Sequence, residues 1–198
     1  MIQKYFSTNY SGNFSIPEKS KLNYLALISD SHIELNFDFT GKEWNIFLIC
    51  FWKGNTTCKI KTSVNSSDSN VNIFILSFLQ DDNYINVDWD ISMSKGISNS
   101  KWHLLEKNII LWKKIKVKAS PRLDVYSQNV QSTHGVSIDK LDKEKMFYIM
   151  SRGLSNHETM ELIIHSYIQY ILDFFQVVQE PEKMEIEQKI LLSIKIDD

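Results

Sequence analysis

The chain is poor in cysteine and lacks long hydrophobic runs. Its 198 residues include two cysteines, and Cys50 and Cys58 fit neither a disulfide framework nor the paired spacing of a zinc site. No apolar run approaches the ~20 residues that a membrane-spanning helix needs, and the first residues lack the apolar core of a signal peptide. These absences predict a cytoplasmic protein with reduced thiols, in which Cys50 ends an apolar run and is buried.

Neither sign of charge dominates the sequence. Lys and Arg together number 22 against 24 for Asp and Glu, which gives a net charge of -2. A nucleic-acid partner or an anionic membrane would require a basic surface. The one basic cluster, at 113–118, alternates with apolar residues as the solvated face of a strand does. We therefore expect no nucleic-acid partner and no membrane partner.

The motifs of common enzymes are also missing. The sequence has no G-x-x-x-x-G-K-[ST] loop and no nucleophile elbow, so any ATP hydrolysis linked to the chain must come from a partner. His157, Glu161 and His165 are spaced four apart, but they do not form H-E-x-x-H, and a solvated or packed helix face explains them. A metal-dependent enzyme that uses histidines and carboxylates stays open as the alternative function.

The residues that are present indicate a β-rich core. Apolar residues make up 43% of the chain, which is enough for a sizeable core. Residues 32–39 and 85–93 alternate apolar and polar side chains, as half-buried strands do, and five tryptophans among such segments favour core packing. The polar residues 1–21 show no period. We predict a poorly ordered lead-in at 1–21 and a β-rich core at 22–136.

After the β-rich part the pattern changes to helical spacing. Apolar residues within 141–152 recur on one face, and Gly153 follows where a glycine commonly ends a helix. Ser155 and Glu158 form an S-x-x-E capping box, in which each side chain accepts from the backbone N–H of the other. We therefore predict a C-terminal helical domain at 137–198.

Two further helices complete this predicted domain. One is expected over 156–179, and its apolar residues cover more than one stripe, so more than one face should be buried. A shorter amphipathic helix is expected over 182–196.

Four stretches of the sequence occur in the order and near-constant spacing of one known family. Residues 122–135 read R-L-D-V-Y-S-Q-N-V-Q-S-T-H-G and resemble its P-x-L-E-I-[FY]-A-D-D-V-K-C-S-H-G. Residues 136–142 are similar to its A-T-V-G-x-L-D, 146–154 to its L-F-Y-L-x-S-R-G-I, and 106–111 to its N-x-L-L-L strand. The family is that of the SufB and SufD subunits of the SUF iron–sulfur cluster assembly complex. The S-T-H-G resembles SufD more than SufB.

The resemblance implies a fold and a role. It implies a right-handed parallel β-helix followed by C-terminal α-helices. The implied role is a non-catalytic scaffold for iron–sulfur cluster assembly, which pairs with a SufB-like subunit through the β-helix and binds a SufC-like ABC ATPase through the C-terminal helices. The chain alone is then expected to bind no cofactor firmly, while the cluster is held transiently in the complex. The chain is shorter than usual members on its N-terminal side, so several coils are expected to be missing.

The resemblance also implies which residues bind partners: Ser132, His134, Gly135, Tyr148, Arg152 and Gly153. His134 is in addition a candidate iron ligand at a cluster site shared with SufB, because an imidazole nitrogen can bind iron; packing at a strand end is the alternative. Ser132 stands where the family has a cysteine, and a hydroxyl is a poor iron ligand beside a soft thiolate. This change favours a third possibility, a SufD-like chain that only anchors SufC.

Three of these positions also have simple structural explanations. Gly135 would allow a close backbone approach or a positive φ. Arg152 at a helix C-terminus is stabilised by the helix dipole, and Gly153 is explained by its capping role.

Overall fold

The computed structural model describes residues 2–7, 11–16, 21–28, 32–40, 42–52, 55–79, 84–111, 115–174, 184 and 188. The chain divides into two compact units, Met1–Asp139 and Lys140–Asp198. The first is built from strands and the second contains the helices.

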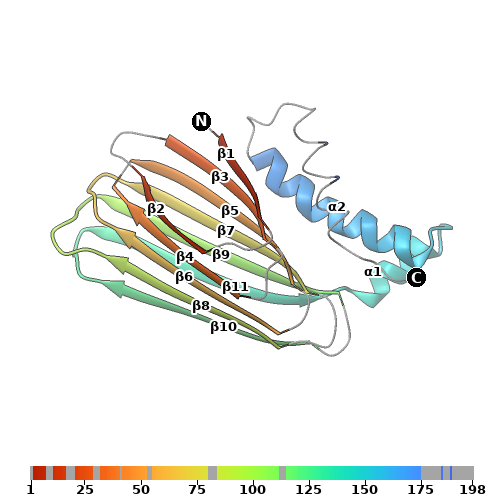
Figure 1. Cartoon of the computed structure of the whole chain (residues 1–198). Helices are drawn as coiled ribbons and strands as arrows, with labels where there is room; N and C mark the ends of the chain where they lie inside the picture. Colours follow the sequence, from red (N-terminus) through yellow and green to blue (C-terminus); the bar gives the residue numbers. More distant parts are fainter. Residues whose placement is uncertain are drawn as a thin grey trace. The chain divides into compact units, whose positions relative to one another are not determined.

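The elements follow one another in a simple order (Figure 1). They are β1 (Ile2–Ser7), β2 (Ser11–Ile16), β3 (Lys21–Ile28), β4 (His32–Phe39), β5 (Glu43–Trp52), β6 (Thr56–Val64), β7 (Asn70–Leu79), β8 (Tyr84–Met93), β9 (Ser100–Ile110), β10 (Lys116–Val125), β11 (Val130–Lys140), α1 (Lys143–Met150) and α2 (Asn156–Phe174). The last strand therefore extends beyond residue 136, where the sequence placed the end of the β-rich core.

The strands build two parallel sheets (Figure 1). Odd-numbered strands form one sheet in the order β1-β3-β5-β7-β9-β11, and even-numbered strands form the other in the order β10-β8-β6-β4-β2. The chain thus crosses from one sheet to the other and back in each coil. Each coil pairs in parallel with the coil before it, as between Asn70 and Lys101. This is a parallel β-helix, which confirms the predicted fold class of a β-helix followed by α-helices.

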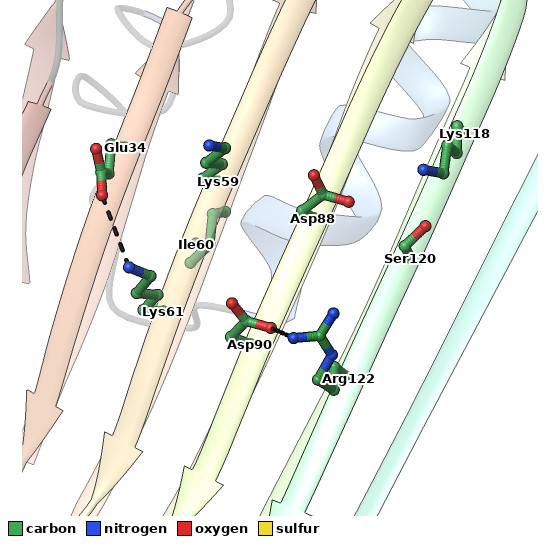
Figure 2. A pocket seen from close by; sticks show the side chains of 9 residues that line it. All are labelled: Glu34, Lys59, Ile60, Lys61, Asp88, Asp90, Lys118, Ser120 and Arg122. Carbon is green, nitrogen blue, oxygen red and sulfur yellow. Dashed lines mark ion pairs between the residues drawn. The ribbon is translucent and has the colours of Figure 1, made fainter.

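The alternation in the sequence decides which side chains face inward. In β8 the apolar residues are buried and the polar residues between them are half-buried or exposed. β4 covers 32–39 and β8 covers 84–93, so both predicted strands are confirmed. Charged side chains of four strands project outward from the even-numbered sheet (Figure 2). A slip of one residue in any of these charged strands would bury its charges, which disfavours other registers.

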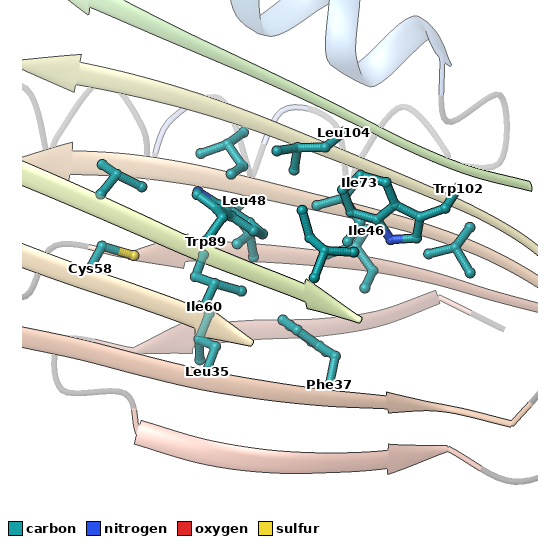
Figure 3. Close-up of a cluster of buried hydrophobic side chains, with 14 of the residues drawn as sticks. Leu35, Phe37, Ile46, Leu48, Cys58, Ile60, Ile73, Trp89, Trp102 and Leu104 are labelled. Atoms are coloured by element: carbon teal, nitrogen blue, oxygen red, sulfur yellow. The ribbon is translucent and has the colours of Figure 1, made fainter. Parts of the chain in front are cut away.

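Stacked apolar side chains fill the space between the sheets (Figure 3). Trp44 and Trp89 have no exposed surface and Trp102 is 2% exposed, which confirms their predicted place in the core. Cys50 and Cys58 are also buried and free, so the predicted buried thiol is confirmed. Each aromatic ring contributes a large apolar area, and truncation of such a ring to alanine typically costs about 3 to 5 kcal/mol.

Polar side chains stack at the corners between the sheets. Asp68 and Asn99 lie on successive coils, and both have positive φ, 57° and 54°. The Asn99 Nδ2 donates to Asp68 Oδ1 at 2.7 Å, and the Asn99 N–H donates to the Asn129 carbonyl at 2.7 Å. Asx residues adopt the left-handed conformation more readily than other non-glycine residues. These corners therefore turn the chain and link neighbouring coils at once.

The helix ends follow the predicted capping signals. The Asp142 carboxylate accepts from the Glu144 N–H at 2.9 Å at the start of α1. The Ser155 hydroxyl accepts from the Glu158 N–H at 3.2 Å, and Glu158 Oε2 accepts from the Ser155 N–H at 2.7 Å. The hydrogen bond from the Ser155 backbone N–H, and to a smaller extent one from the Ser155 side chain, lower the pKa of Glu158. With Gly153 at φ 100° after α1, both the capping box and the glycine cap are confirmed.

The N-terminal residues differ from the expectation. The sequence predicted a poorly ordered lead-in at 1–21, whereas residues 2–7 and 11–16 form β1 and β2 and pair in parallel with β3 and β4. Parallel pairing uses backbone groups, so a polar segment without a clear period can still add a strand to an existing sheet. The predicted end of the second helix and the helix at 182–196 lie outside the described residues, apart from Met184 and Gln188, as do the side chains of Trp52 and Trp112.

Replacement of Asn99 should separate backbone strain from side-chain bonding at the corner. Asn99→Ala loses the bond to Asp68 and places a Cβ-bearing residue with no local partner at positive φ, so unfolding should become easier by about 1 to 2 kcal/mol. Asn99→Gly loses the same bond but removes the strain and should cost less. Urea unfolding of the three proteins measures the difference. An equal loss in both variants would contradict a role for backbone conformation.

Candidate functional site

The β-helix ends at its C-terminal side with an uncovered coil. β10 and β11 are the last strands of their sheets, so their inward side chains have no further coil over them among the described residues. Val125 is 41% exposed, Val136 36% and Ile138 47%, and Tyr126, which directly follows β10, is 65% exposed. Apolar side chains in this position indicate a surface that another molecule covers.

Ser132 and His134 lie on the inward side of this last coil. The intervening Thr133 faces outward, because its Oγ1 lies 2.6 Å from Nδ1 of His103, and His103 alternates with the buried residues of β9. Successive side chains of a strand point to opposite faces, so Ser132 and His134 both face the uncovered end. His134 is exposed, while the Ser132 Oγ is buried and has no hydrogen-bond partner in the described structure.

Gly135 lies in the middle of β11 with ordinary strand backbone. Its φ is not positive, unlike that of Gly153, so the suggestion that Gly135 serves a left-handed conformation is wrong. A Cβ built at Gly135 would lie 3.4 Å from Leu105 Cδ1, which is close but ordinary contact. Strand pairing with β9 holds this backbone extended, and the glycine removes a side chain from the outward face.

Two of the predicted partner-binding residues contact each other in the helical unit. The Arg152 guanidinium lies 4.6 Å from the centre of the Tyr148 ring, and its Nη2 donates to the Tyr148 hydroxyl. Both side chains are exposed, and Phe147 beside them is 75% exposed. The pair therefore presents an aromatic and cationic surface, made of side chains that are enriched where proteins bind each other.

α2 has one buried stripe. Met160, Ile164 and Ile168 are buried, whereas Leu162 and Tyr170 are 49% and 69% exposed. The sequence predicted that more than one face would be buried, so part of the expected burial is not made by the described residues. The helical unit therefore has exposed apolar side chains on α2 as well as on α1.

The histidines and carboxylates of the described residues do not converge. No group of three or more His, Cys, Asp or Glu side chains in the described part of the chain is placed to hold a metal ion. His157 Nε2 instead pairs with Glu161 Oε1 at 3.3 Å along one helix face. No described helix is long and apolar enough to cross a membrane.

A buried polar cluster lies inside the β-helix and was not predicted from the sequence. Glu106 and Asn108 have no exposed surface, and Asn108 Nδ2 donates to Glu106 Oε1 at 2.7 Å. The second oxygen, Glu106 Oε2, has no partner among the described residues. Burial raises the pKa of Glu106 to about 7 against the weaker opposing effect of the Asn108 bond. The sequence did contain a signal for this burial, because Glu106 continues the every-second-residue series of Trp102 and Leu104 and so lies on the same face of the strand.

The two thiols next to this cluster are protonated at neutral pH. Burial raises the pKa of Cys50, the charge of Glu106 raises it further, and the Ser77 hydroxyl has the opposite, smaller effect. Burial likewise raises the pKa of Cys58 well above its usual value. Since the thiolate is the nucleophile and the metal ligand, neither cysteine has the chemistry of an accessible iron ligand in this fold.

The described residues thus form a parallel β-helix whose last coil is uncovered, followed by helices with exposed aromatic residues. Residues 18–167 match the family described as SUF system FeS cluster assembly, SufBD core domain. The chain belongs to this SufBD family.

Relatives with curated names agree with this membership. The chain is 33% identical over 69 residues to an iron–sulfur cluster assembly SufBD family protein of Synechocystis, covering 35% of this chain and 15% of the relative. It is 25% identical over 77 residues to SufD of Escherichia coli, covering 39% and 18%. It is 30% identical over 100 residues to SufD of Plasmodium falciparum, covering 50% and 7%. The match thus covers less than a fifth of each of these three relatives.

Stability should depend on pH through Glu106. Its pKa is higher in the folded chain than in the unfolded chain, so between about pH 4.5 and pH 7 the folded state keeps a proton that the unfolded state has lost. This contribution to stability is complete below the unfolded pKa and is lost as pH rises, by up to about 3 kcal/mol. Denaturant unfolding at several pH values measures the loss.

Glu106→Gln keeps the shape and cannot ionise, so this part of the pH dependence should disappear. The control is Asp124→Asn, which neutralises an exposed carboxylate on β10 and should leave the profile unchanged. A wild-type profile that is flat between pH 5 and pH 8 would show that Glu106 ionises as freely as in water.

Proposed function

We propose that the chain is a SufD-type, non-catalytic scaffold subunit of iron–sulfur cluster assembly in the cytoplasm. The observation that carries the proposal is the uncovered last coil, because it exposes His134 of the S-T-H-G segment among exposed apolar side chains. The role is to hold partners, and the cluster is cargo that forms on the assembled complex.

Pairing with a SufB-type subunit is supported by the backbone of the last coil. β10 and β11 each pair with another described strand on one side only. Unpaired strand edges readily accept a further strand, and the partly exposed Val136 and Ile138 would gain by burial, at roughly 25 cal/mol per Å² of apolar surface. A partner that continues the β-helix satisfies both the backbone and the side chains.

Binding of a SufC-type ABC ATPase is supported by the helical unit. The chain has no ATP-binding loop of its own. Phe147 and Tyr148 on α1 are 75% and 58% exposed, and Arg152 is stacked on the Tyr148 ring. Aromatic and Arg side chains commonly dominate the binding energy of protein interfaces. Gly153 lies in the link between α1 and α2 and has a positive φ. Its part in partner binding is to set the backbone conformation of this link.

His134 is the side chain that we propose to contact the cluster. It is exposed on the inward face of the last coil, where an imidazole nitrogen is available to iron. Ser132 lies on the same face but offers a poor ligand for iron. A narrower function, in which the chain only anchors the ATPase, is favoured by this serine and is distinguished from the first by cluster formation.

The two partner surfaces should be separable by mutation. Phe147→Ala with Tyr148→Ala should weaken binding of the SufC-type ATPase by about tenfold or more, since two interface aromatic residues are lost, and leave the SufB-type subunit bound. Tyr126→Ala removes a comparably exposed aromatic residue at the end of β10 and should do the reverse. Calorimetric titration with each purified partner gives the affinities. If the α1 variant bound the ATPase as tightly as the wild type, the assignment of this surface of α1 to ATPase binding would be wrong.

His134→Ala should lower the yield of cluster on the assembled complex and leave both partners bound, because only an iron-binding nitrogen is removed. Ser132→Ala should have little effect, and Ser132→Cys should increase iron retention by supplying a thiolate. Iron and sulfide analysis of the complex, with gel filtration as the control for assembly, tests this. Loss of the SufB-type subunit from His134→Ala would make the residue an interface contact, and an unchanged yield would remove it from the site.

A further inference from the structure

The outer face of the even-numbered sheet has charges that change sign from strand to strand (Figure 2). β4 carries Glu34 and Asp38, β6 carries Lys59 and Lys61, and β8 carries Asp88 and Asp90. β10 carries three cations and one carboxylate on the same face, namely Lys116, Lys118, Arg122 and Asp124. The order of signs along the stack is therefore negative, positive, negative and positive.

Strand register brings these opposite charges together. Lys59 lies beside Glu34 and Asp88, and Lys61 lies beside Asp90. Arg122 lies beside Asp90 on the next strand, with Nη1 3.4 Å from Oδ1. Opposite charges that face each other across neighbouring strands contribute about 0.2 to 1 kcal/mol per pair, whereas like charges are unfavourable. The alternation is thus the arrangement that parallel stacking of charged strands requires.

The series stops on a cationic strand. β10 is the last strand of its sheet, and its Lys116 and Lys118 make no ion pair with any described residue. Arg122 uses one nitrogen toward Asp90, and its guanidinium has further N–H groups for a second carboxylate. The outward row of β10 is therefore only partly satisfied, because on β8 Arg122 lies opposite Asp90, whereas Lys116 lies opposite Tyr84 and Lys118 opposite Asn86.

Backbone pairing at the free edge of β10 discriminates less between partner strands than the side-chain charges do. Backbone N–H groups along a strand alternate between its two neighbours, and the Tyr126 N–H donates to Met93 on the β8 side. The odd-numbered residues of β10 therefore direct their N–H groups to the free edge, and Pro121 in the middle of that edge has none. A strand that pairs there misses one hydrogen bond, which leaves the choice of partner to the side-chain charges.

We propose that the strand that continues the even-numbered sheet past β10 belongs to the SufB-type partner and carries acidic residues opposite Lys116, Lys118 and Arg122. The inference rests on the proposed pairing and adds the sign of the charges that the partner's strand carries. A second copy of this chain would set one cationic row against another, so the same row disfavours the homodimer. Salt should consequently weaken the pairing with the partner and strengthen self-association.

The test reverses the charge of the row in the full chain. Lys116→Glu with Lys118→Glu should weaken binding of a purified SufB-type subunit by about tenfold or more, reverse the dependence of this binding on salt because salt then screens a repulsion, and leave binding of the SufC-type ATPase unchanged. Lys42→Glu with Lys101→Glu is the matched control, because both residues are exposed, lie at the other sheet and change the net charge equally. Lys118→Gln, which only removes a charge, should give a smaller loss in the same direction.

The outcomes separate the two levels of inference. If the wild-type chain and the charge-reversed variant bind the SufB-type subunit equally well, the proposal of an acidic partner strand is wrong, while the proposed pairing stands. If both double variants weaken binding equally, general charge and not the row is responsible, and the inference is again overturned. If the wild-type chain does not bind the SufB-type subunit at all, the proposed function fails and the inference fails with it.

Discussion

The stacking of each coil on the preceding one is the interaction on which this structure depends. Strand pairing satisfies the backbone polar groups of a coil through its neighbours, and the inward side chains, such as Trp89 and Trp102, bury one another along the axis. Neither contribution is available to a single coil. The position of a coil in the stack therefore decides whether its surfaces are complete, and the last coil is complete on one side only.

Three different kinds of contact all follow the same stacking direction. Apolar side chains stack inside, Asp68 and Asn99 stack at a corner, and charges of opposite sign stack on the outer face. Each would be left unsatisfied at an end of the stack. A β-helix is for this reason suited to assembly, because a further strand that pairs with an open end completes its apolar surface, its backbone edge and its charges.

The interior is not uniformly apolar. Glu106, Asn108, Ser77 and the two cysteines lie in one region of it, and Glu106 Oε2 is unpartnered among the described residues. A buried carboxylate without a cation prefers to stay protonated. Glu106 lies on β9, which has a paired strand on each side.

The sequence by itself determined the elements whose signals are local. The alternation at 32–39 and 85–93, the Ser155–Glu158 capping box, the Gly153 cap and the family motif around His134 are each set by residues close together in the chain. The tertiary structure decided what lies side by side across coils: the alternation of charge that ends at β10, the burial of Glu106, and the exposure of His134 on the inward face of the last coil. The residues that pair in these arrangements belong to different coils, and parallel register, which no single segment specifies, is what brings them together.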